Sequence, residues 1–336
     1  MVNYLQKELR VSIIQHPPVY MNLRASIEKA GHLSCQASSE GAMVVVFPET
    51  WLPGYPVWLD SSPNAALWGY EPTRKLYRTL VDNSITIPGK PFDSLRKIAG
   101  DNGVYLVMGC HELVGHTLYN SMLYLFPDGQ GYSLHRKIMP TYTEKLIWGM
   151  ADGSTLNSVK TDFGILGGLI CWEHWMPLAR ALMHEQGEVL HIAQWPAVKD
   201  LHQIASRHYA FEGQCFVAAA GTVLTKTDVL EGFDSLPGAN PAAREVLQMI
   251  ACGNDGLLQN GGSTFIRPDS THLTKPLFEK NSIITANLDL EEIKEGHLLM
   301  DTRGHYSRPD IFELKCNFKK QVNLSSDDMS RSVRGE

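Results

Sequence analysis

Short runs of β-branched and aliphatic residues alternate along this chain with longer amphipathic helical patterns, and the same order occurs twice. Each half reads as strand, helix, strand, helix, strand and hairpin. In the first half the strands are expected at 10–15, 43–47 and 104–108, the helices at 22–40 and 91–102, and the hairpin at 121–136. In the second half the strands are expected at 165–170, 189–194 and 215–220, the helices at 177–186 and 199–214, and the hairpin at 264–275, with a last strand at 282–288.

This duplicated order predicts two similar β-sheets packed together, with helices on both outer faces, which makes a four-layer α/β architecture. The run 43–47 (MVVVF) is apolar at every position, as expected for a strand of a sheet that helices cover. An ordinary single α/β sheet, in which the repeated order is coincidental, is the alternative.

Two long stretches, 50–90 and 222–262, do not fit the repeated order. The second includes one plausible helix at 241–252, and insertions of this length in a compact domain tend to be functional loops. The last residues, 325–336 (SSDDMSRSVRGE), are polar and are expected to form a disordered tail. We therefore expect one folded domain over residues 1–324.

The overall composition excludes several classes of protein. With 30 basic and 36 acidic residues the net charge is −6, so the chain has no field that would gather nucleic acid. No apolar run approaches the roughly 18 residues of a membrane helix, so we expect no membrane partner. The six cysteines lie far apart without a CxxC pair, which argues against a disulfide framework or a zinc site and favours a cytoplasmic protein.

Cys171 is the strongest candidate for a chemically active residue. It ends the apolar, glycine-containing strand at 165–170, and a helix that starts with proline begins six residues later. Such a junction projects a side chain at the carboxyl edge of a sheet, where open α/β folds place their sites. A nearby helix start and a cationic neighbour would favour the reactive thiolate. We interpret Cys171 as a nucleophile rather than a small buried hydrophobe, and His174 as a core histidine.

Three further polar residues stand at or shortly after expected strand ends. Glu49 follows the run 43–47, where an acid either caps a turn or acts as a base with a raised pKa. Lys137 closes the strand YSLHRK, and Glu144 follows seven residues later. Either of these alone is ordinarily a solvated surface charge. A thiol, a carboxylate and an ammonium at three strand ends together make a candidate site.

Three segments resemble the signature blocks of the nitrilase branch of the carbon-nitrogen hydrolases. They are FPETWLPGYP around Glu49, HRKIMPTYTEKLIWG around Lys137 and CWEHWMPLAR around Cys171. Their order is that of the family, and the resemblance extends over about residues 9–314. The sequence Cys-Trp-Glu-His is similar to nitrilases proper, whereas the amidase and carbamoylase branches usually carry other residues after the cysteine.

The resemblance implies an αββα sandwich and a catalytic triad of Glu49, Lys137 and Cys171. The additional active-site glutamate of the family corresponds to Glu144. The resemblance also implies that no metal and no organic cofactor are needed, and that the chain forms a homodimer or a larger homo-oligomer. The folded domain over 1–324 is then a carbon-nitrogen hydrolase domain.

The substrate pocket is expected to use aromatic residues near these segments. Trp172 follows the nucleophile, and its backbone N–H would help to hold negative charge that develops during the reaction. Tyr55 belongs to the aromatic stretch after Glu49, which is expected to shape the pocket. Trp148 and Trp195 are expected to approach it.

The activity that the resemblance implies is hydrolysis of a small organic nitrile, with two waters, to a carboxylic acid and ammonia. The covalent intermediates would be a thioimidate and a thioester on Cys171. An amidase with the same triad is one alternative, and a cyanide- or nitrile-hydratase-like enzyme that releases the amide is another. A non-catalytic binding protein of this fold is a remote alternative, because its expected mark is the loss of a triad member.

Overall fold

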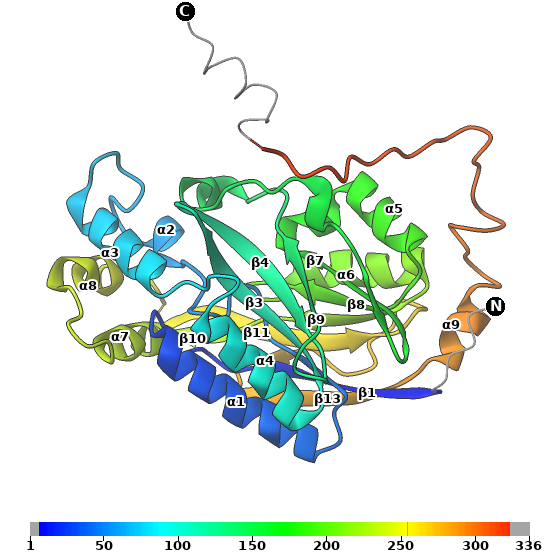
Figure 1. The fold of residues 1–336 in the computed structure, drawn as a ribbon, viewed down its shortest axis with the longest axis horizontal. Coiled ribbons are helices and arrows are strands. Elements are labelled where there is room, and N and C mark those ends of the chain that lie inside the picture. The colour runs from blue at the N-terminus through cyan, green and yellow to red at the C-terminus, as the bar shows by residue number, and fades with distance from the viewer. Residues whose placement is uncertain (1–6, 254, 323–336) are drawn as a thin grey trace, which may run out of the picture.

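The computed structural model describes residues 7–253 and 255–322 and contains two β-sheets packed face to face between helices (Figure 1). The first sheet has the strand order β13-β1-β2-β3-β4-β5. Its strands are β13 (Ser282–Asp289), β1 (Glu8–Gln15), β2 (Val44–Val46), β3 (Tyr105–Val114), β4 (Thr117–Leu125) and β5 (Tyr132–Arg136). Strands β1, β2 and β3 are parallel, and the other neighbours are antiparallel.

The second sheet repeats this plan with the order β10-β11-β9-β8-β7-β6, and β12 pairs with β11. Its strands are β10 (Val223–Thr225), β11 (Leu257–Ile266), β9 (Phe216–Ala220), β8 (Glu188–Gln194), β7 (Gly164–Ile170), β6 (Val159–Thr161) and β12 (Leu277–Phe278). Strands β7, β8 and β9 are parallel, like β1, β2 and β3. The four-layer α/β sandwich is therefore confirmed, and the single-sheet alternative is wrong.

Each outer face carries a pair of helices. Helices α1 (Leu23–Ser39) and α4 (Lys90–Asn102) cover the first sheet, and α5 (Pro177–Glu185) and α6 (Asp200–Gly213) cover the second (Figure 1). Helix α1 begins where the Asn22 side chain accepts a hydrogen bond from the backbone N–H of Ala25 at 3.1 Å. The chain leaves this helix at Gly41, whose φ of 88° suits glycine.

The core shows why β2 is apolar at every position. Val44 and Val46 are fully buried in the hydrophobic cluster between the two sheets, whereas Val45 is fully buried in the cluster beneath α1 and α4. Successive side chains of a strand point to opposite faces, so a strand covered on both sides needs apolar residues throughout. Each such valine contributes about 1.5–3 kcal/mol of burial free energy.

The two long stretches of the sequence form a third hydrophobic cluster at one end of the molecule (Figure 1). They contain α2 (Trp58–Ser61), α3 (Glu71–Asp82), α7 (Lys226–Asp234) and α8 (Pro241–Gln248). Only the helix at 241–252 is predicted from the sequence, and α8 is four residues shorter. Helix α3 is hard to predict because Leu76 and Leu80 are its only buried residues.

The second hairpin differs from the prediction. The turn after β11 forms, since the Arg267 backbone N–H donates to the Thr271 carbonyl at 2.9 Å. Residues 273–275 are not a strand, because the Thr274 hydroxyl takes the place of a backbone partner and accepts from the Phe265 N–H at 2.9 Å. Pairing with β11 resumes only at β12. The last strand, β13, then crosses over and pairs with β1 of the first sheet.

The remaining described elements are short. They are the 3-10 helices η1 (Tyr142–Leu146), η2 (Gly153–Thr155) and η3 (Cys171–Trp175), and helix α9 (Glu291–Gly296). Residues 297–322 follow α9 as turns and irregular chain along the outside (Figure 1). The tail predicted at 325–336 lies outside the described residues, and the domain boundary stays a prediction.

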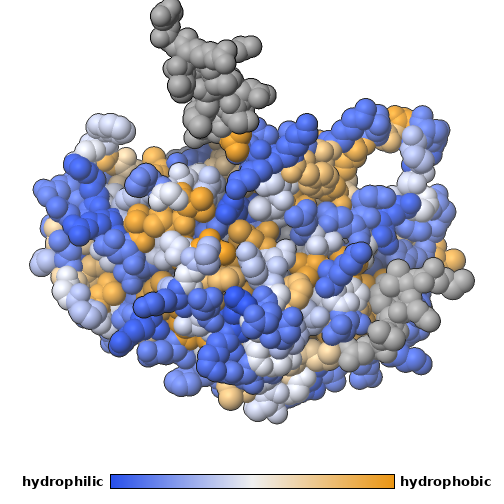
Figure 2. Space-filling model, viewed as in Figure 1, coloured by the Kyte–Doolittle hydropathy of each residue, from blue (hydrophilic) through white to orange (hydrophobic). Residues whose placement is uncertain are grey.

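The surface is mixed in character. On the face shown in Figure 2, hydrophilic residues predominate and apolar residues form separate patches between them. Within residues 7–253 and 255–322, no helix has the length and apolar character that crossing a membrane requires.

Candidate active site

Glu49 lies in the turn that follows β2, and the neighbouring strand β3 passes close to this turn. Gly109 is required there, because a Cβ at its position would lie 2.1 Å from the Pro48 carbonyl oxygen. Glu49 is 1% exposed, and its Oε1 accepts hydrogen bonds from Lys137 Nζ at 2.9 Å and from Asn120 Nδ2 at 2.7 Å. Its Oε2 has no partner among the described residues, so this oxygen is available to accept a proton.

Lys137 follows directly on β5 and is as deeply buried as Glu49. Its Nζ donates hydrogen bonds to Oε1 of Glu49 at 2.9 Å and to Oε2 of Glu144 at 2.7 Å. The ring of Trp148 lies 5.6 Å from the ammonium, within the range of a cation–π contact. A single cation therefore fixes two carboxylates whose positions come from different loops.

Glu144 belongs to the 3-10 helix η1, in the loop after Lys137. Its Oε2 also accepts from the Thr141 backbone N–H at 2.5 Å, and its Oε1 accepts from the Tyr55 hydroxyl at 2.7 Å. Tyr55 comes from the first long stretch, so this stretch and η1 meet at one carboxylate. Every oxygen of Glu144 thus has a donor, whereas Glu49 keeps one oxygen free.

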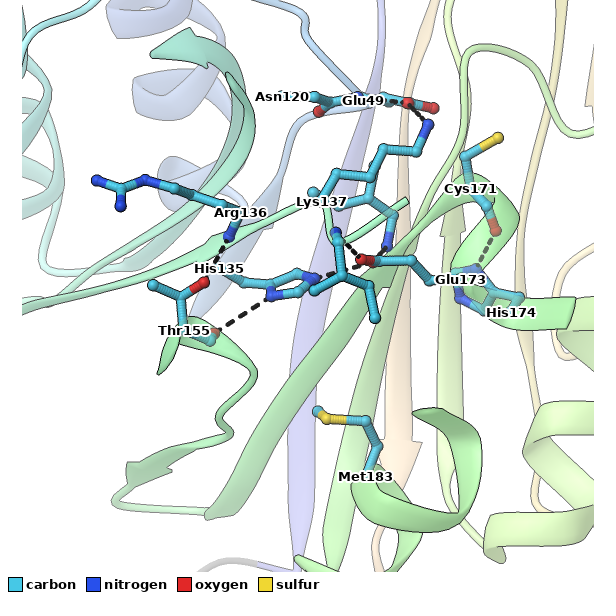
Figure 3. Close-up of polar contacts among 12 residues, drawn as sticks. Glu49, Asn120, His135, Arg136, Lys137, Thr155, Cys171, Glu173, His174 and Met183 are labelled. Carbon is cyan, nitrogen blue, oxygen red and sulfur yellow. Dashed lines mark hydrogen bonds and ion pairs between the residues drawn. The ribbon is translucent and has the colours of Figure 1, made fainter. Parts of the chain in front are cut away.

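Cys171 is the residue that follows β7, and it begins the 3-10 helix η3. Its φ is 50°, in the left-handed region that non-glycine residues enter only with strain. Its sulfur and carboxylate oxygens of Glu49 and Glu144 all lie within 4.8 Å of one another. Figure 3 shows the sulfur beside the ends of the Glu49 and Lys137 side chains. The four polar residues singled out in the sequence are therefore brought together.

Burial governs the ionisation of this cluster. It raises the pKa of Glu49 to about 7, against the opposing charge of Lys137. It also raises the pKa of the Cys171 thiol well above its usual value, although Lys137 and the backbone N–H of Trp172 act in the other direction. For Lys137 burial opposes the charge, but the neighbouring negative groups, led by Glu49, outweigh it and raise the pKa. The resting cluster holds an ammonium and a thiol, so the thiol needs a base.

A cavity of about 390 Å³ opens beside Cys171 and Glu144. Its walls come from residues 55–61 and 251–259 of the two long stretches, and from 196–202 between β8 and α6. This volume suits a small organic molecule. The long stretches thus supply the cavity wall, in agreement with the functional role expected for insertions of their length.

Comparison with known proteins agrees with this geometry. Residues 10–297 match the family described as carbon-nitrogen hydrolase. The chain belongs to the carbon-nitrogen hydrolase family. Among its relatives, Nitrilase 2 of Arabidopsis thaliana is 36% identical over 331 residues, which cover 96% of this chain and 95% of that protein. A bifunctional nitrilase/nitrile hydratase of Lupinus angustifolius is 35% identical over 91% of this chain and 85% of that protein.

A solved structure supports the fold of this hydrolase. The crystal structure of a CN-hydrolase superfamily protein from Xanthomonas campestris superposes with a TM-score of 0.65 at 16% identity, covering 89% of this chain and 97% of that chain. The family and the sandwich fold that three short segments imply are therefore confirmed.

The aromatic residues predicted for the hydrolase's pocket have different surroundings. Tyr55 lines the cavity. Trp148 is not part of the cavity wall, and its indole N–H donates to His111 Nδ1 at 3.0 Å. Trp195 is fully buried and does not line the cavity either, because its ring stacks on His174 with 4.6 Å between the ring centroids. Trp148 and Trp195 therefore pack around the site without lining its cavity.

The Trp172 side chain is 43% exposed. It packs against Trp175, with 5.5 Å between the ring centroids. Its backbone N–H favours the thiolate of Cys171 and so opposes the burial that raises the pKa of that thiol overall. The contribution of Trp172 to the site is thus made by its backbone.

Two functional neighbours are not predicted from the sequence. Asn120 is a polar residue in the middle of the apolar strand β4, and this contrast is its only signal. Glu173 is fully buried and accepts from His135 Nε2 at 2.8 Å and from the backbone N–H groups of Ile170 at 2.6 Å and Ile138 at 2.7 Å. One carboxylate thereby joins the end of β7 to the segment that follows β5 (Figure 3).

The donor atoms of Glu49, Glu144 and Cys171 are close enough together to hold a metal ion. Lys137, however, already places its ammonium against both carboxylates. The chain therefore supplies positive charge to this site from its own side chain. The arrangement suits proton transfer and nucleophilic attack by the thiol.

Proposed function

We propose that this carbon-nitrogen hydrolase is a nitrilase, which converts a small organic nitrile and two waters into a carboxylic acid and ammonia. The observation that carries the proposal is the Cys171 thiol at the cavity, within 4.8 Å of a carboxylate oxygen of Glu49 and one of Glu144. Lys137 bridges these two acids. The two relatives, a nitrilase and a bifunctional nitrilase/nitrile hydratase, support the choice of a nitrile as substrate.

The first step forms a covalent bond between the protein and the substrate. The free Oε2 of Glu49 takes the proton of the Cys171 thiol, and the thiolate adds to the nitrile carbon. The proton that Glu49 has taken then passes to the nitrile nitrogen, which yields a neutral thioimidate. Covalent capture divides a difficult hydration into easier steps, and positioned proton transfer of this kind contributes about 10²–10⁴-fold to the rate.

Two waters complete the reaction. Glu49 removes a proton from the first water, which adds to the thioimidate carbon and gives a tetrahedral intermediate. Protonation of the nitrogen and cleavage of the carbon–nitrogen bond release ammonia and leave a thioester on Cys171. The second water adds in the same way, and cleavage of the carbon–sulfur bond releases the acid and restores the thiol.

Lys137 and Glu144 assist these steps without forming bonds to the substrate. The ammonium of Lys137 stabilises negative charge that develops first on nitrogen and then on oxygen, an effect that commonly amounts to about 10²–10³ in rate. Glu144 holds this ammonium in place at 2.7 Å, and Tyr55 fixes Glu144 in turn. The backbone N–H of Trp172 supports the thiolate.

An amide product is the second candidate outcome, and the name of the Lupinus relative specifically favours it. The carbon of the tetrahedral intermediate carries both the sulfur of Cys171 and an amino group. If the carbon–sulfur bond breaks first, the amide leaves and the enzyme acts as a nitrile hydratase. An amidase with the same residues is a further alternative. Chromatography of the products from a nitrile, beside turnover of the matching amide, separates the three.

The decisive test of the proposal is the variant Cys171→Ala. We expect a folded protein that releases neither acid, amide nor ammonia from a panel of aliphatic, aromatic and arylaliphatic nitriles, because the covalent step is lost. Cys110→Ala is the matched control, since this buried cysteine lies in β3 away from the cavity lining. Turnover by a pure Cys171→Ala preparation would end the proposal, as would a wild-type protein inactive on every nitrile and active on amides.

We also infer a homodimeric or larger enzyme of the cytoplasm. Apolar side chains stand exposed on the helices over the second sheet, with Leu178, Leu201 and Ile204 at 62–70% exposure. The cysteines of the described residues are free thiols, which supports a reducing compartment. Light scattering of the purified protein tests the assembly, and a monomer at micromolar concentration would contradict it.

A further inference from the structure

A chain of buried polar side chains lies behind the nucleophile, and the proposed reaction does not use it. His174 Nδ1 lies 2.9 Å from the carbonyl oxygen of Cys171, and His174 Nε2 lies 3.0 Å from His191 Nε2 (Figure 3 shows the first contact). His191 Nδ1 lies 3.0 Å from Glu188 Oε1, and Tyr209 donates its hydroxyl to Glu188 Oε2 at 2.5 Å. All four side chains are at most 5% exposed.

The identity of the first acceptor determines which atom carries the proton in each of these hydrogen bonds. A carbonyl oxygen only accepts, so His174 must carry a proton on Nδ1 to donate to Cys171. A neutral His174 then accepts at Nε2, which requires a proton on Nε2 of His191. A neutral His191 in turn accepts at Nδ1, which requires a proton on Glu188. Three links therefore need three protons, and the complete set carries no net charge.

The surroundings of Glu188 favour this neutral set. Burial raises the pKa of the Glu188 carboxyl to about 7, against the opposing effects of Tyr209, His184 and Arg303. Burial also lowers the pKa of both His174 and His191 well below the usual value. The titratable and charged groups that face Glu188 are His191 of β8, Tyr209 of α6, His184 of α5, Tyr124 of β4, Cys215 before β9 and Arg303 of the C-terminal segment.

We propose that His174, His191 and Glu188 are positioning residues that hold the backbone of Cys171 for attack, and that loss of one proton from this chain at high pH releases that hold and limits activity. The proposal rests on the proposed role of Cys171 as nucleophile. It is carried by the three hydrogen-bonded links and by the left-handed backbone of Cys171, which needs support from its surroundings.

The loss of a proton acts at a distance because the acceptors differ in strength. An ionised Glu188 is the strongest acceptor among these groups, so His191 moves its only proton from Nε2 to Nδ1 and donates it to Glu188. His191 then accepts at Nε2, so His174 turns its only proton from Nδ1 to Nε2. A lone pair of His174 now faces the carbonyl oxygen of Cys171, and the support of the strained residue becomes repulsion.

The positions of the protons can be observed without any assay of activity. In the full-length protein with ¹⁵N-labelled histidine, NMR distinguishes a ring nitrogen that carries a proton from one that does not. At pH 6 we expect His174 with its proton on Nδ1 and His191 with its proton on Nε2. Above the alkaline limit of activity both tautomers should be exchanged. Signals are assigned with His174→Gln and His191→Gln.

Two substitutions of Glu188 separate the proton from the space that the side chain fills. In Glu188→Gln the amide N–H donates permanently to His191 and the amide oxygen accepts from Tyr209, so kcat at pH 7 should stay within about twofold of wild type. Glu188→Leu leaves His191 without a donor, and kcat should fall at least about tenfold with KM unchanged. Glu185→Gln is the matched control on the exposed end of α5.

The alkaline limb of the pH profile is the decisive readout. In Glu188→Gln the decline of kcat at high pH should disappear or move upward by at least about one unit, because the amide cannot lose its proton. An unchanged alkaline limb, a Gln variant as inactive as the Leu variant, or a His174 without a proton on Nδ1 at pH 6 would each overturn the proposal. If Cys171 were not the nucleophile, Cys171→Ala would stay active while the tautomers remained as described.

Discussion

Glu49 divides its carboxylate between two tasks. Oε1 accepts hydrogen bonds from Lys137 and Asn120. Oε2 has no partner among the described residues, and it is the oxygen that accepts the proton in the proposed reaction. Burial raises the pKa of this carboxyl to about 7, so the basic form appears only as the pH approaches neutrality. We therefore expect kcat/KM to rise with pH through about 7, as the base loses its proton.

The variant Glu49→Gln keeps the size of the side chain and removes the base. Its kcat is expected to be at least about 100-fold lower than that of wild type, because positioned proton transfer is lost. Steady-state rates between pH 5 and 9 measure the loss of kcat. They also show whether the rise of kcat/KM with pH, expected for wild type, is missing in the variant. Glu40→Gln, at an exposed position after α1, is the control. A Glu49→Gln enzyme with the wild-type rate and pH profile would remove Glu49 from its proposed role.

Tyr55 gives a finer prediction at the same scale. Its hydroxyl donates to Glu144 at 2.7 Å, and the variant Tyr55→Phe leaves that buried oxygen without this donor. We expect kcat to fall about tenfold, because an unmet buried acceptor costs about 1–3 kcal/mol, while the retained ring keeps KM nearly unchanged. Tyr142→Phe, at a residue that is 83% exposed, should leave both constants unchanged. A larger change in KM than in kcat would instead assign Tyr55 to substrate binding.

At the scale of the elements, Glu173 fastens β7 to the segment after β5 through three donors. Burial disfavours its charge, but His135 and the two backbone N–H groups outweigh burial and lower the pKa of Glu173. For His135 burial acts against the charge, yet Glu173 prevails and raises the pKa of the imidazole. The Glu173 carboxylate therefore stabilises the fold at pH values above the pKa of this group in the unfolded chain, about 4.5. The His135 imidazolium stabilises the fold below the pKa of this group in the unfolded chain, about 6.5. The pair thus contributes most to stability between about pH 4.5 and 6.5.

Removal of this link should weaken both the fold and the site. We expect Glu173→Ala to lower the free energy of unfolding by about 3–5 kcal/mol, because a buried partner and two N–H groups lose their acceptor. Urea denaturation followed by circular dichroism measures this loss, with Glu185→Ala as the surface control. The difference from wild type should shrink as the pH falls below about 4.5, where Glu173 becomes protonated in the unfolded chain. A loss below about 1 kcal/mol would show that β7 and β5 are joined by other contacts.

The elements that the sequence reveals are those whose pattern is local. The strand patterns stop just before Glu49, Lys137 and Cys171, so the ends of these strands, and the residues that gather there, can be predicted. Strands β6 and β10 are as short as β2 but, unlike β2, do not lie in a run that is apolar at every position, so no strand pattern marks them. The pairing of His191 with His174 depends on how β8, η3 and α6 pack together, and residues far apart in sequence determine that packing.

At the scale of the whole molecule, the site lies on the seam between the two halves. The first sheet supplies Glu49 and Lys137, the second supplies Cys171, and the cavity wall comes from both long stretches. Neither half holds the complete cluster, so the packing of the sheets is itself a requirement for activity. The same packing buries acids such as Glu188 that would be ionised in water. The gain or loss of a proton by these acids therefore changes the free energy of unfolding of the whole protein.

That balance predicts how stability changes with pH. Burial raises the pKa of Glu188 from 4.5 to about 7, so the folded state keeps a proton that the unfolded chain releases. Stability from this group is complete below pH 4.5 and is lost as the pH rises towards 7, by about 1.4 kcal/mol per pH unit. The variant Glu188→Gln lacks this pH-dependent contribution to stability, because an amide does not titrate. The unfolding free energy of wild type relative to the variant should therefore decrease from pH 5 to 7 and level off above it. Urea titrations at four pH values measure this difference, and two parallel curves would mean that Glu188 is ionised in the folded protein.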